Sequence, residues 1–175
     1  MYDNGKVSSV LDYSVEGKES EEQFDAALEM VLKTIVFAKE RNAIPFAVFK
    51  PTGLGRFALY QKITEKNTLT ESEKEEWNRV VARFHSLCKK AHDLNVSVLI
   101  DGEESWMQDA ADDLVLEMMR TYNTEKTVVY NTLQLYRWDR LDYMKELHKT
   151  ATNEGFYIGM KLVRGAYMEK ENDRA

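Results

Sequence analysis

The sequence has one cysteine, two prolines and three histidines in 175 residues. A single cysteine excludes an internal disulfide and a cysteine-rich metal site, and three histidines leave little for zinc, so we predict no metal site. No stretch reaches the roughly 18 apolar residues that a membrane-spanning helix needs, and residues 1–5 lack the apolar region of a signal peptide. We therefore expect a reduced, soluble globular domain, or a piece of a larger one.

Positive charge is also in the minority. Lys and Arg together number 24 and Asp and Glu 30, which gives a formal net charge of −6 and an isoelectric point near 5.2. Without a basic block, the chain is a poor binder of phosphate backbones, and we predict no nucleic-acid partner. The sequence is nevertheless 43% hydrophobic and 11% aromatic, so it can build a core.

Two kinds of segment alternate along the chain. The first kind is short, apolar and rich in β-branched or aromatic residues, which is typical of strands buried on both faces of a parallel sheet. We expect such strands near residues 7–11, 44–50, 96–101, 127–131 and 156–163.

The second kind is long, with apolar residues at helical spacing. Three of these helices follow a capping-box pattern, in which a hydroxyl residue precedes Glu or Gln by three positions: Ser20–Gln23, Thr70–Glu73 and Ser105–Gln108. Two further helices are expected near residues 57–63 and from about Asp139 onward.

Strict alternation of strand and helix predicts a parallel α/β sheet, either open and doubly wound or closed as a barrel. The units repeat every roughly 37 residues, so eight of them would need about 300 residues, within the range of a (β/α)₈ barrel. Residues 170–175 predict the start of another helix, and three units of such a barrel would lie outside this chain. We expect residues 1–175 to form one partial barrel domain.

Polar side chains follow every predicted strand, where parallel α/β folds gather their functional residues. They are Asp12 and Glu16, then Lys50, then Asp101, then Asn131 and Gln134, and finally Lys161, Arg164 and Tyr167. Lys50, Asp101 and Lys161 continue their strands without a turn residue in between. Because half-buried charges need partners, we expect these three side chains to share one rim of the sheet.

A glycine pattern, Gly53-x-Gly55-x-x-Ala58, has the spacing of a dinucleotide-binding loop. Lys50 and Pro51 separate it from the preceding strand, and no second strand ending in an acidic residue follows at the required distance. A nicotinamide-cofactor site is therefore disfavoured.

The strand exits together resemble one family. Lys161-Leu-Val-Arg-Gly-Ala-Tyr167 is similar to the signature strand of the flavin-dependent proline dehydrogenases, also called proline oxidases. The segments that resemble the family's first four strand exits, in order, are Leu11–Glu16, Phe49–Gly53, Ile100–Glu104 and Tyr130–Tyr136. The resemblance covers essentially the whole chain and implies the first five β/α units of a (β/α)₈ TIM-type barrel.

The resemblance also implies an activity: FAD-dependent oxidation of L-proline to Δ1-pyrroline-5-carboxylate, with electrons passing to a quinone or membrane acceptor. The implied location is cytoplasmic or peripheral to the inner membrane, and mitochondrial in a eukaryote. Three residues gain implied catalytic roles. Lys50 would face the proline carboxylate, Asp101 would lie on the pocket floor, and Tyr167 would line the pocket beside the cofactor.

Further residues gain implied binding roles. Gln134 would hydrogen-bond the isoalloxazine ring, and Arg164 would be another cofactor-binding residue. Lys161, where many members have Arg, would place a positive charge near the flavin and favour its reduced form. Glu16 resembles a carboxylate that the family uses as a gate.

One departure from the family is clear. The family's last barrel helix carries paired arginines, and no Arg-Arg pair occurs in these 175 residues. We therefore expect this chain alone to hold little or no FAD, to lack proline oxidation and to self-associate through its sheet edges. Two alternatives stay open: a non-catalytic β/α module that only folds or associates, and a barrel lyase or aldolase with Lys50 or Lys161 as a Schiff-base lysine.

Overall fold

A computed structural model of the protein describes residues 2–13 and 17–174. Five parallel strands form one sheet in the order β1-β2-β3-β4-β5, as predicted. The strands are β1 (Val10–Asp12), β2 (Phe46–Phe49), β3 (Ser97–Ile100), β4 (Val129–Gln134) and β5 (Met160–Val163). The sheet is open, and β1 and β5 form its two edges.

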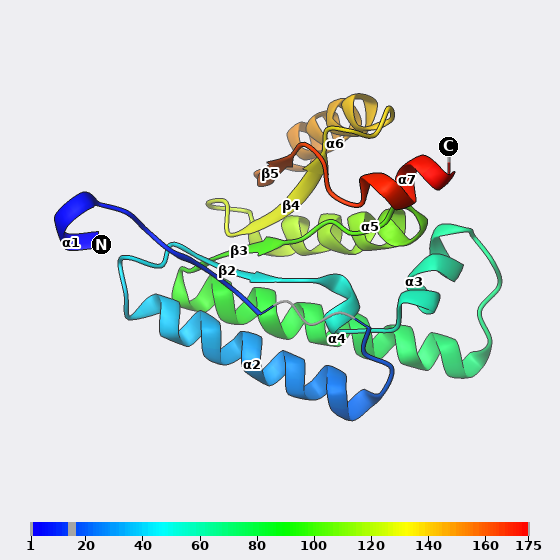
Figure 1. Cartoon of the computed structure of the whole chain (residues 1–175), viewed down its shortest axis with the longest axis horizontal. Coiled ribbons are helices and arrows are strands. Elements are labelled where there is room, and N and C mark those ends of the chain that lie inside the picture. Colours follow the sequence, from blue (N-terminus) through cyan, green and yellow to red (C-terminus); the bar gives the residue numbers. More distant parts are fainter. Residues whose placement is uncertain (1, 14–16, 175) are drawn as a thin grey trace.

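Helices fill every connection between the strands, and one further helix lies before β1 and one after β5. They are α1 (Tyr2–Gly5), α2 (Glu21–Lys39), the short 3₁₀ helix η1 (Pro51–Gly53), α3 (Phe57–Thr64), α4 (Glu71–Leu94), α5 (Ser105–Tyr122), α6 (Arg140–Glu154) and α7 (Met168–Arg174). In Figure 1, α2 and α4 lie side by side below the strands and α6 lies above them. The short helix α3 packs against α5. This is the strand–helix alternation that the sequence predicts.

The strand bounds differ from the prediction by three residues or more at three places, and by one or two residues elsewhere. β1 begins at Val10 rather than at residue 7, because only Val10–Asp12 pair with β2. β5 begins at Met160, four residues later than predicted. β4 extends to Gln134 rather than ending at residue 131, because Asn131–Gln134 pair with Met160–Val163 of β5.

The capping boxes have mixed outcomes. At α4 the predicted box forms: the Thr70 side chain accepts the Glu73 N–H at 3.3 Å, and the Glu73 carboxylate accepts the Thr70 N–H at 2.7 Å. Ser20 is the N-cap of α2 as predicted, but Gln23 accepts a hydrogen bond from the N–H of Glu19, at 3.1 Å, instead of completing a box.

At α5 the predicted cap is wrong. Glu104 is the N-cap and Ser105 is the first helical residue. The Gln108 side chain turns back beyond the cap and accepts the N–H of Glu103 at 2.7 Å. A buried partner thus replaces the local pairing that the spacing predicts.

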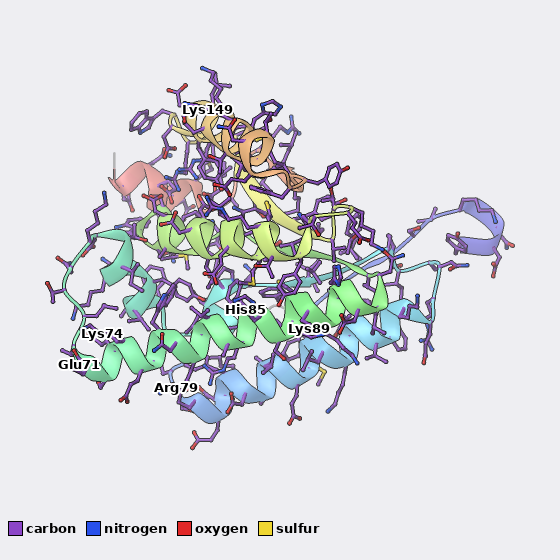
Figure 2. All side chains as sticks on the ribbon, turned by 180° about the vertical axis from the view of Figure 1, so that it is seen from behind. Glu71, Lys74, Arg79, His85, Lys89 and Lys149 are labelled. Carbon is purple, nitrogen blue, oxygen red and sulfur yellow. The ribbon has the colours of Figure 1, made fainter. Side chains whose placement is uncertain are left out.

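One hydrophobic core lies between the sheet and its helices. Its fully buried members come from α2, α4, α5 and the strands, among them Ile35, Phe84, Leu87, Cys88, Val98, Ile100, Ala111 and Met118. Burial raises the pKa of the Cys88 thiol far above its usual range. The outer helix surfaces are charged, as Figure 2 shows along α4 for Glu71, Arg79 and Lys89. Within the residues described, no helix combines the length and apolarity needed to span a bilayer.

Candidate active site

Five of the predicted site residues share the sheet face opposite the core. Side chains alternate along a strand, and residues paired across parallel strands point to the same side. Ala47 and Phe49 belong to the core, so Val48 and Lys50 face the other way. Asp12 is paired with Val48 and therefore lies on this second face. By the same alternation the second face also carries Asp101, Gln134 and Lys161, each at or near the carboxyl end of its strand.

Two of these residues form an ion pair across the sheet. The Lys161 ammonium on β5 contacts the Asp101 carboxylate, which directly follows β3, so the pair passes over β4. The two side chains are 29% and 19% exposed, and each supplies the opposite charge that a half-buried ion needs. The backbone N–H of Asp101 donates to the carbonyl of Phe49 at 3.0 Å and holds the main chain at this strand exit against β2.

A second contact reaches further across the sheet. The Nζ atom of Lys50 donates to the Oη atom of Tyr167 at 3.1 Å and lies 5.7 Å from the centre of the same ring. Tyr167 has φ 57°, the left-handed backbone region that residues other than glycine enter only at a cost. The loop after β5 is thereby tied to the exit of β2.

The Gln134 side chain is fixed beneath this rim. It is 1% exposed, and its amide nitrogen donates to the Glu103 carbonyl at 2.5 Å and to the Tyr136 hydroxyl at 2.8 Å. Its amide oxygen lies 3.4 Å from a guanidinium nitrogen of Arg137. Burial raises the pKa of Tyr136, so its hydroxyl stays neutral. Both N–H groups of the amide therefore already have acceptors.

Two other residues from the strand exits, Arg164 and Asn131, do not join these contacts. Glu16 lies outside the described residues. Arg164 follows β5 with an exposed side chain, and within the described part of the chain no hydrogen bond links it to Lys50, Asp101 or Lys161. The prediction that Asn131 lies just past the fourth strand is wrong, because this residue lies inside β4.

Because β4 is longer than predicted, Asn131 falls inside the strand on its helix-facing side. Its amide nitrogen donates to Asp112 of α5 at 2.9 Å and to the hydroxyl of Tyr143 of α6 at 3.2 Å. Asn131 thus belongs to the helix layer and lies on the opposite side of the sheet from Gln134.

The glycine pattern after β2 has a packing role. A Cβ atom on Gly55 would lie 2.4 Å from Cγ2 of Val80, so only glycine lets the chain approach α4 this closely. Gly53 ends the 3₁₀ turn η1. Close packing against α4 thus explains Gly55 without a nucleotide.

Sequence reasoning missed Glu103, which is 5% exposed. Its carboxylate accepts the backbone N–H of Thr52 at 3.0 Å and the Thr52 hydroxyl at 2.7 Å. The signal was available: Glu103 follows β3 two residues after Asp101, at the same strand exit.

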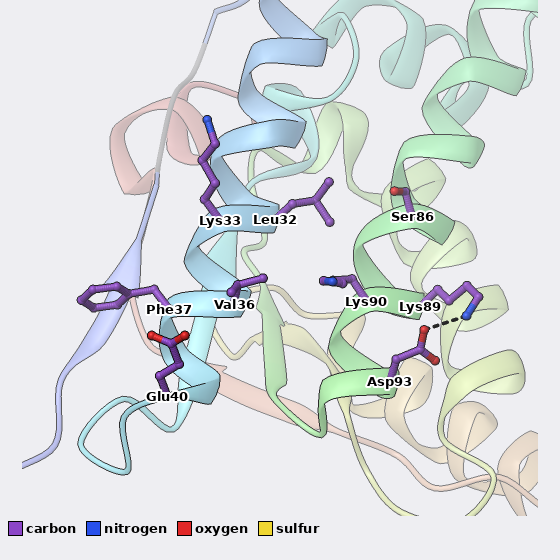
Figure 3. Close-up of a pocket in the computed structure, with 9 residues that line it drawn as sticks. All are labelled: Leu32, Lys33, Val36, Phe37, Glu40, Ser86, Lys89, Lys90 and Asp93. Atoms are coloured by element: carbon purple, nitrogen blue, oxygen red, sulfur yellow. Dashed lines mark hydrogen bonds and ion pairs between the residues drawn. The ribbon is translucent and has the colours of Figure 1, made fainter.

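A groove of about 660 Å³ lies away from this rim, on the outer side of α2 and α4 (Figure 3). Leu32, Val36 and Phe37 line it, together with the ion pair between Lys89 and Asp93, which measures 2.7 Å. These residues belong to the carboxyl-terminal halves of the helices, which lead into the amino ends of β2 and β3. The groove is therefore at the end of the sheet opposite the candidate site.

Comparison with known proteins identifies the family. The family model described as proline dehydrogenase matches residues 1–175. This chain belongs to the proline dehydrogenase family. It is 41% identical over 165 residues to the carbapenem antibiotics biosynthesis protein CarD of Pectobacterium carotovorum subsp. carotovorum, covering 94% of this chain and 44% of that protein.

Eukaryotic members of the proline dehydrogenase family are also similar. Proline dehydrogenase 1, mitochondrial, of Drosophila melanogaster is 40% identical over 103 residues, which cover 59% of this chain and 15% of that protein. The human protein of the same name is 40% identical over 106 residues, which cover 61% of this chain and 18% of that protein. The chain thus spans less than half the length of these curated relatives.

Solved structures support the predicted fold. A crystal structure of a Bradyrhizobium japonicum Proline Utilization A (PutA) mutant matches with a TM-score of 0.75 at 16% identity, covering 97% of this chain and 17% of that one. PutA from Bdellovibrio bacteriovorus, inactivated by N-propargylglycine, matches with a TM-score of 0.76 at 15% identity, covering 97% and 19%. The predicted fold class, the first five β/α units of a TIM-type barrel, is confirmed.

Proposed function

We propose that the protein carrying this chain oxidises L-proline to Δ1-pyrroline-5-carboxylate, with FAD as the electron acceptor. One observation carries the proposal: in a chain of the proline dehydrogenase family, Lys50, Asp101 and Lys161 lie on the polar face of the sheet at its carboxyl end. Proline is a zwitterion, and a site that binds it needs both a cation and an anion.

The lysine at the exit of β2 is the residue we assign to the substrate carboxylate. Lys50 already donates to the Tyr167 hydroxyl, a weak acceptor that a carboxylate would replace or join. Tyr167 then borders the pocket, and its ring covers the lysine. Asp101 supplies the negative charge that faces the substrate nitrogen, while its ion pair with Lys161 holds it in place.

The residues of this face partly fit a flavin. FAD supplies the two-electron acceptor when bound, and a cation beside its ring favours the anionic reduced form, a role that suits Lys161. Gln134 can offer only its amide oxygen, because both of its N–H groups are already used by Glu103 and Tyr136. To accept from the flavin ring, this oxygen would exchange its 3.4 Å contact with Arg137. Arg164 is exposed at the end of β5 and is free to turn toward a bound phosphate or ring. We also propose that the Glu16 carboxylate acts as the gate of the site.

For the 175 residues alone we propose weak FAD binding, no proline oxidation, and self-association. Exposed apolar side chains lie on both edge strands: Val10 on β1 is 51% exposed and Leu162 on β5 is 63% exposed. Unpaired strand edges with apolar side chains favour association with further strands. In the whole protein, electrons leave to a quinone or another membrane acceptor, which places the protein at the membrane surface.

Anaerobic titration of the whole flavin-loaded protein with L-proline tests the activity. We expect proline to bleach the flavin absorbance, and Lys161→Met to slow this reduction. Lys33→Met on the outer side of α2, where Lys33 is 70% exposed, is the matched control and leaves the rate unchanged. A flavin that proline does not reduce would leave the non-catalytic module as the better account.

Light scattering after size-exclusion chromatography tests the 175-residue chain. We expect a dimer or larger assembly without flavin absorbance. A yellow, monomeric and active chain would contradict this part of the proposal.

A further inference from the structure

Glu103 is the centre of a buried set of hydrogen bonds at the carboxyl end of the sheet. Its carboxylate holds Thr52 twice, through the backbone N–H at 3.0 Å and the hydroxyl at 2.7 Å. Thr52 lies in the turn η1, two residues after Lys50. A buried carboxylate from the β3 exit therefore fixes the chain that carries the lysine of the β2 exit.

The backbone of Glu103 makes two further contacts. Its carbonyl accepts the Gln134 amide at 2.5 Å, and its N–H donates to Gln108 of α5 at 2.7 Å. The neighbouring Gly102 lies against β4, where an added Cβ would be 3.1 Å from Cβ of Thr132 and 3.4 Å from the amide carbon of Gln134. One short segment thus contacts the exits of β2 and β4 and the start of α5.

A buried ion pair between α5 and α6 holds the segment of Gly102 and Glu103 in place through Gln108. The Gln108 amide nitrogen donates to Asp112 at 2.7 Å. Asp112 also pairs with Arg140 of α6 at 2.6 Å, and the two side chains are 5% and 6% exposed. Fully satisfied buried networks of this kind rigidify their surroundings. The contacts run without a break from α6 through α5 to the strand exits.

We propose that Glu103 is a positioning residue that sets Lys50 and Gln134 relative to each other. The inference rests on the proposed function, in which the lysine holds the substrate carboxylate and the amide contacts the cofactor. In this role Glu103 contacts neither the substrate nor the cofactor. It fixes the turn after Lys50 with its side chain and the Gln134 amide with its backbone, so substrate and cofactor positions are coupled through one residue.

Two substitutions in the whole flavin-loaded protein test the proposal. Glu103→Gln keeps both contacts, because its oxygen can accept the Thr52 N–H and its nitrogen can donate to the Thr52 hydroxyl. Glu103→Met keeps the approximate volume and removes both. We expect Glu103→Met to raise the KM for proline on the order of tenfold while kcat changes much less, and Glu103→Gln to restore the wild-type KM.

Hydrogen exchange at the Thr52 amide is the second readout. The exchange rate should rise on the order of tenfold in Glu103→Met and stay at the wild-type value in Glu103→Gln. Because Glu103→Met can unfold the protein, Thr52→Val serves as a milder variant that removes only the hydroxyl contact, with a smaller rise in KM. Glu117→Met, on the outer side of α5 where Glu117 is 52% exposed, is the control.

The outcomes separate the two proposals. An unchanged KM in both Glu103→Met and Thr52→Val overturns the positioning role, and so does an equal rise of KM in Glu103→Met and Glu103→Gln. A wild-type protein that does not oxidise proline removes the proposed function instead. The Thr52 exchange rates then still decide whether Glu103 fixes the turn, since they need no substrate.

Discussion

The Nζ atom of Lys50 lies 3.1 Å from the Oη atom of Tyr167, a residue 117 positions later in the chain. β3 and β4 lie between the two strands concerned, so this contact joins opposite sides of the strand exits. The Tyr167 hydroxyl accepts one of the three N–H groups of the Lys50 ammonium. A carboxylate bound by Lys50, as we propose, would therefore lie beside this hydroxyl.

Replacing Lys50 by Ala should weaken proline binding more than FAD binding in the whole protein. Removing the charge partner of a bound carboxylate costs on the order of 2–5 kcal/mol, which corresponds to a rise in KM of at least about thirtyfold. Steady-state kinetics and flavin titration measure the two effects separately. Lys33→Ala, on the outer side of α2, is the control, and an unchanged KM in Lys50→Ala would remove this lysine from the substrate site.

The Asp101–Lys161 ion pair should contribute measurably to stability. Both partners are less than a third exposed, and pairs in such positions couple more strongly than surface pairs. A double-mutant cycle with Asp101→Asn and Lys161→Met, followed by urea unfolding, should give a coupling free energy of about 1–3 kcal/mol.

The matched control for this cycle is the pair between Lys145 and Asp142 on α6, whose side chains are 63% and 82% exposed. Asp142→Asn with Lys145→Met should give a coupling below about 0.5 kcal/mol. Equal couplings in the two cycles would mean that the Asp101–Lys161 pair is solvated and adds little to the fold.

Asp139 should make the stability depend on pH in the acid range. Burial acts to raise the pKa of this carboxyl, but hydrogen bonds from Arg140 and Arg137 outweigh burial and lower the pKa from 3.8 to about 2. The unfolded chain then binds more protons than the folded chain between these two values. The stabilisation is complete above about pH 4 and is lost as the pH falls toward 2.

Asp139→Asn should remove up to about 2 kcal/mol of this contribution near neutral pH and none at pH values below 2. Urea unfolding of both proteins at a series of pH values measures the difference. Asp142→Asn, an exposed carboxylate on the same helix, serves as the control. A difference that stays constant from neutral to acid pH would contradict the assignment.

Gly55→Ala should destabilise the chain by about 1–3 kcal/mol, because its Cβ would lie 2.4 Å from Cγ2 of the buried Val80. In the double variant with Val80→Ala, the added methyl group has space, so the two costs should be less than additive. Thermal unfolding of the three variants measures this. Gly5→Ala is the control, since its Cβ would make only an ordinary 3.6 Å contact with Val7.

The sequence was sufficient for the sheet. Short apolar runs separated by long amphipathic segments predicted five parallel strands in sequential order. The prediction holds because the spacing of apolar residues in each segment records which faces of that strand or helix are buried. The box of Thr70 and Glu73 was predicted because both partners are local, three residues apart in the chain.

The remaining details depend on contacts between distant residues. The length of β4 is set by its pairing with β5, which decides that Asn131 faces the helices. Glu103 meets Thr52, which lies 51 positions earlier, and Gln108 turns to Glu103 rather than to the local cap. Such partners compete with local patterns and become visible only when the strand exits are brought together.

Cys88 gives this molecule a built-in reporter. It is the only thiol in the sequence, it is 0% exposed, and it lies between α4 and the sheet at the centre of the core. A thiol reagent can reach it only when the helices separate from the strands, because the neutral, buried sulfur is unreactive in the closed state. The rate of alkylation under native conditions therefore reports how often α4 separates from the sheet, without any engineered probe.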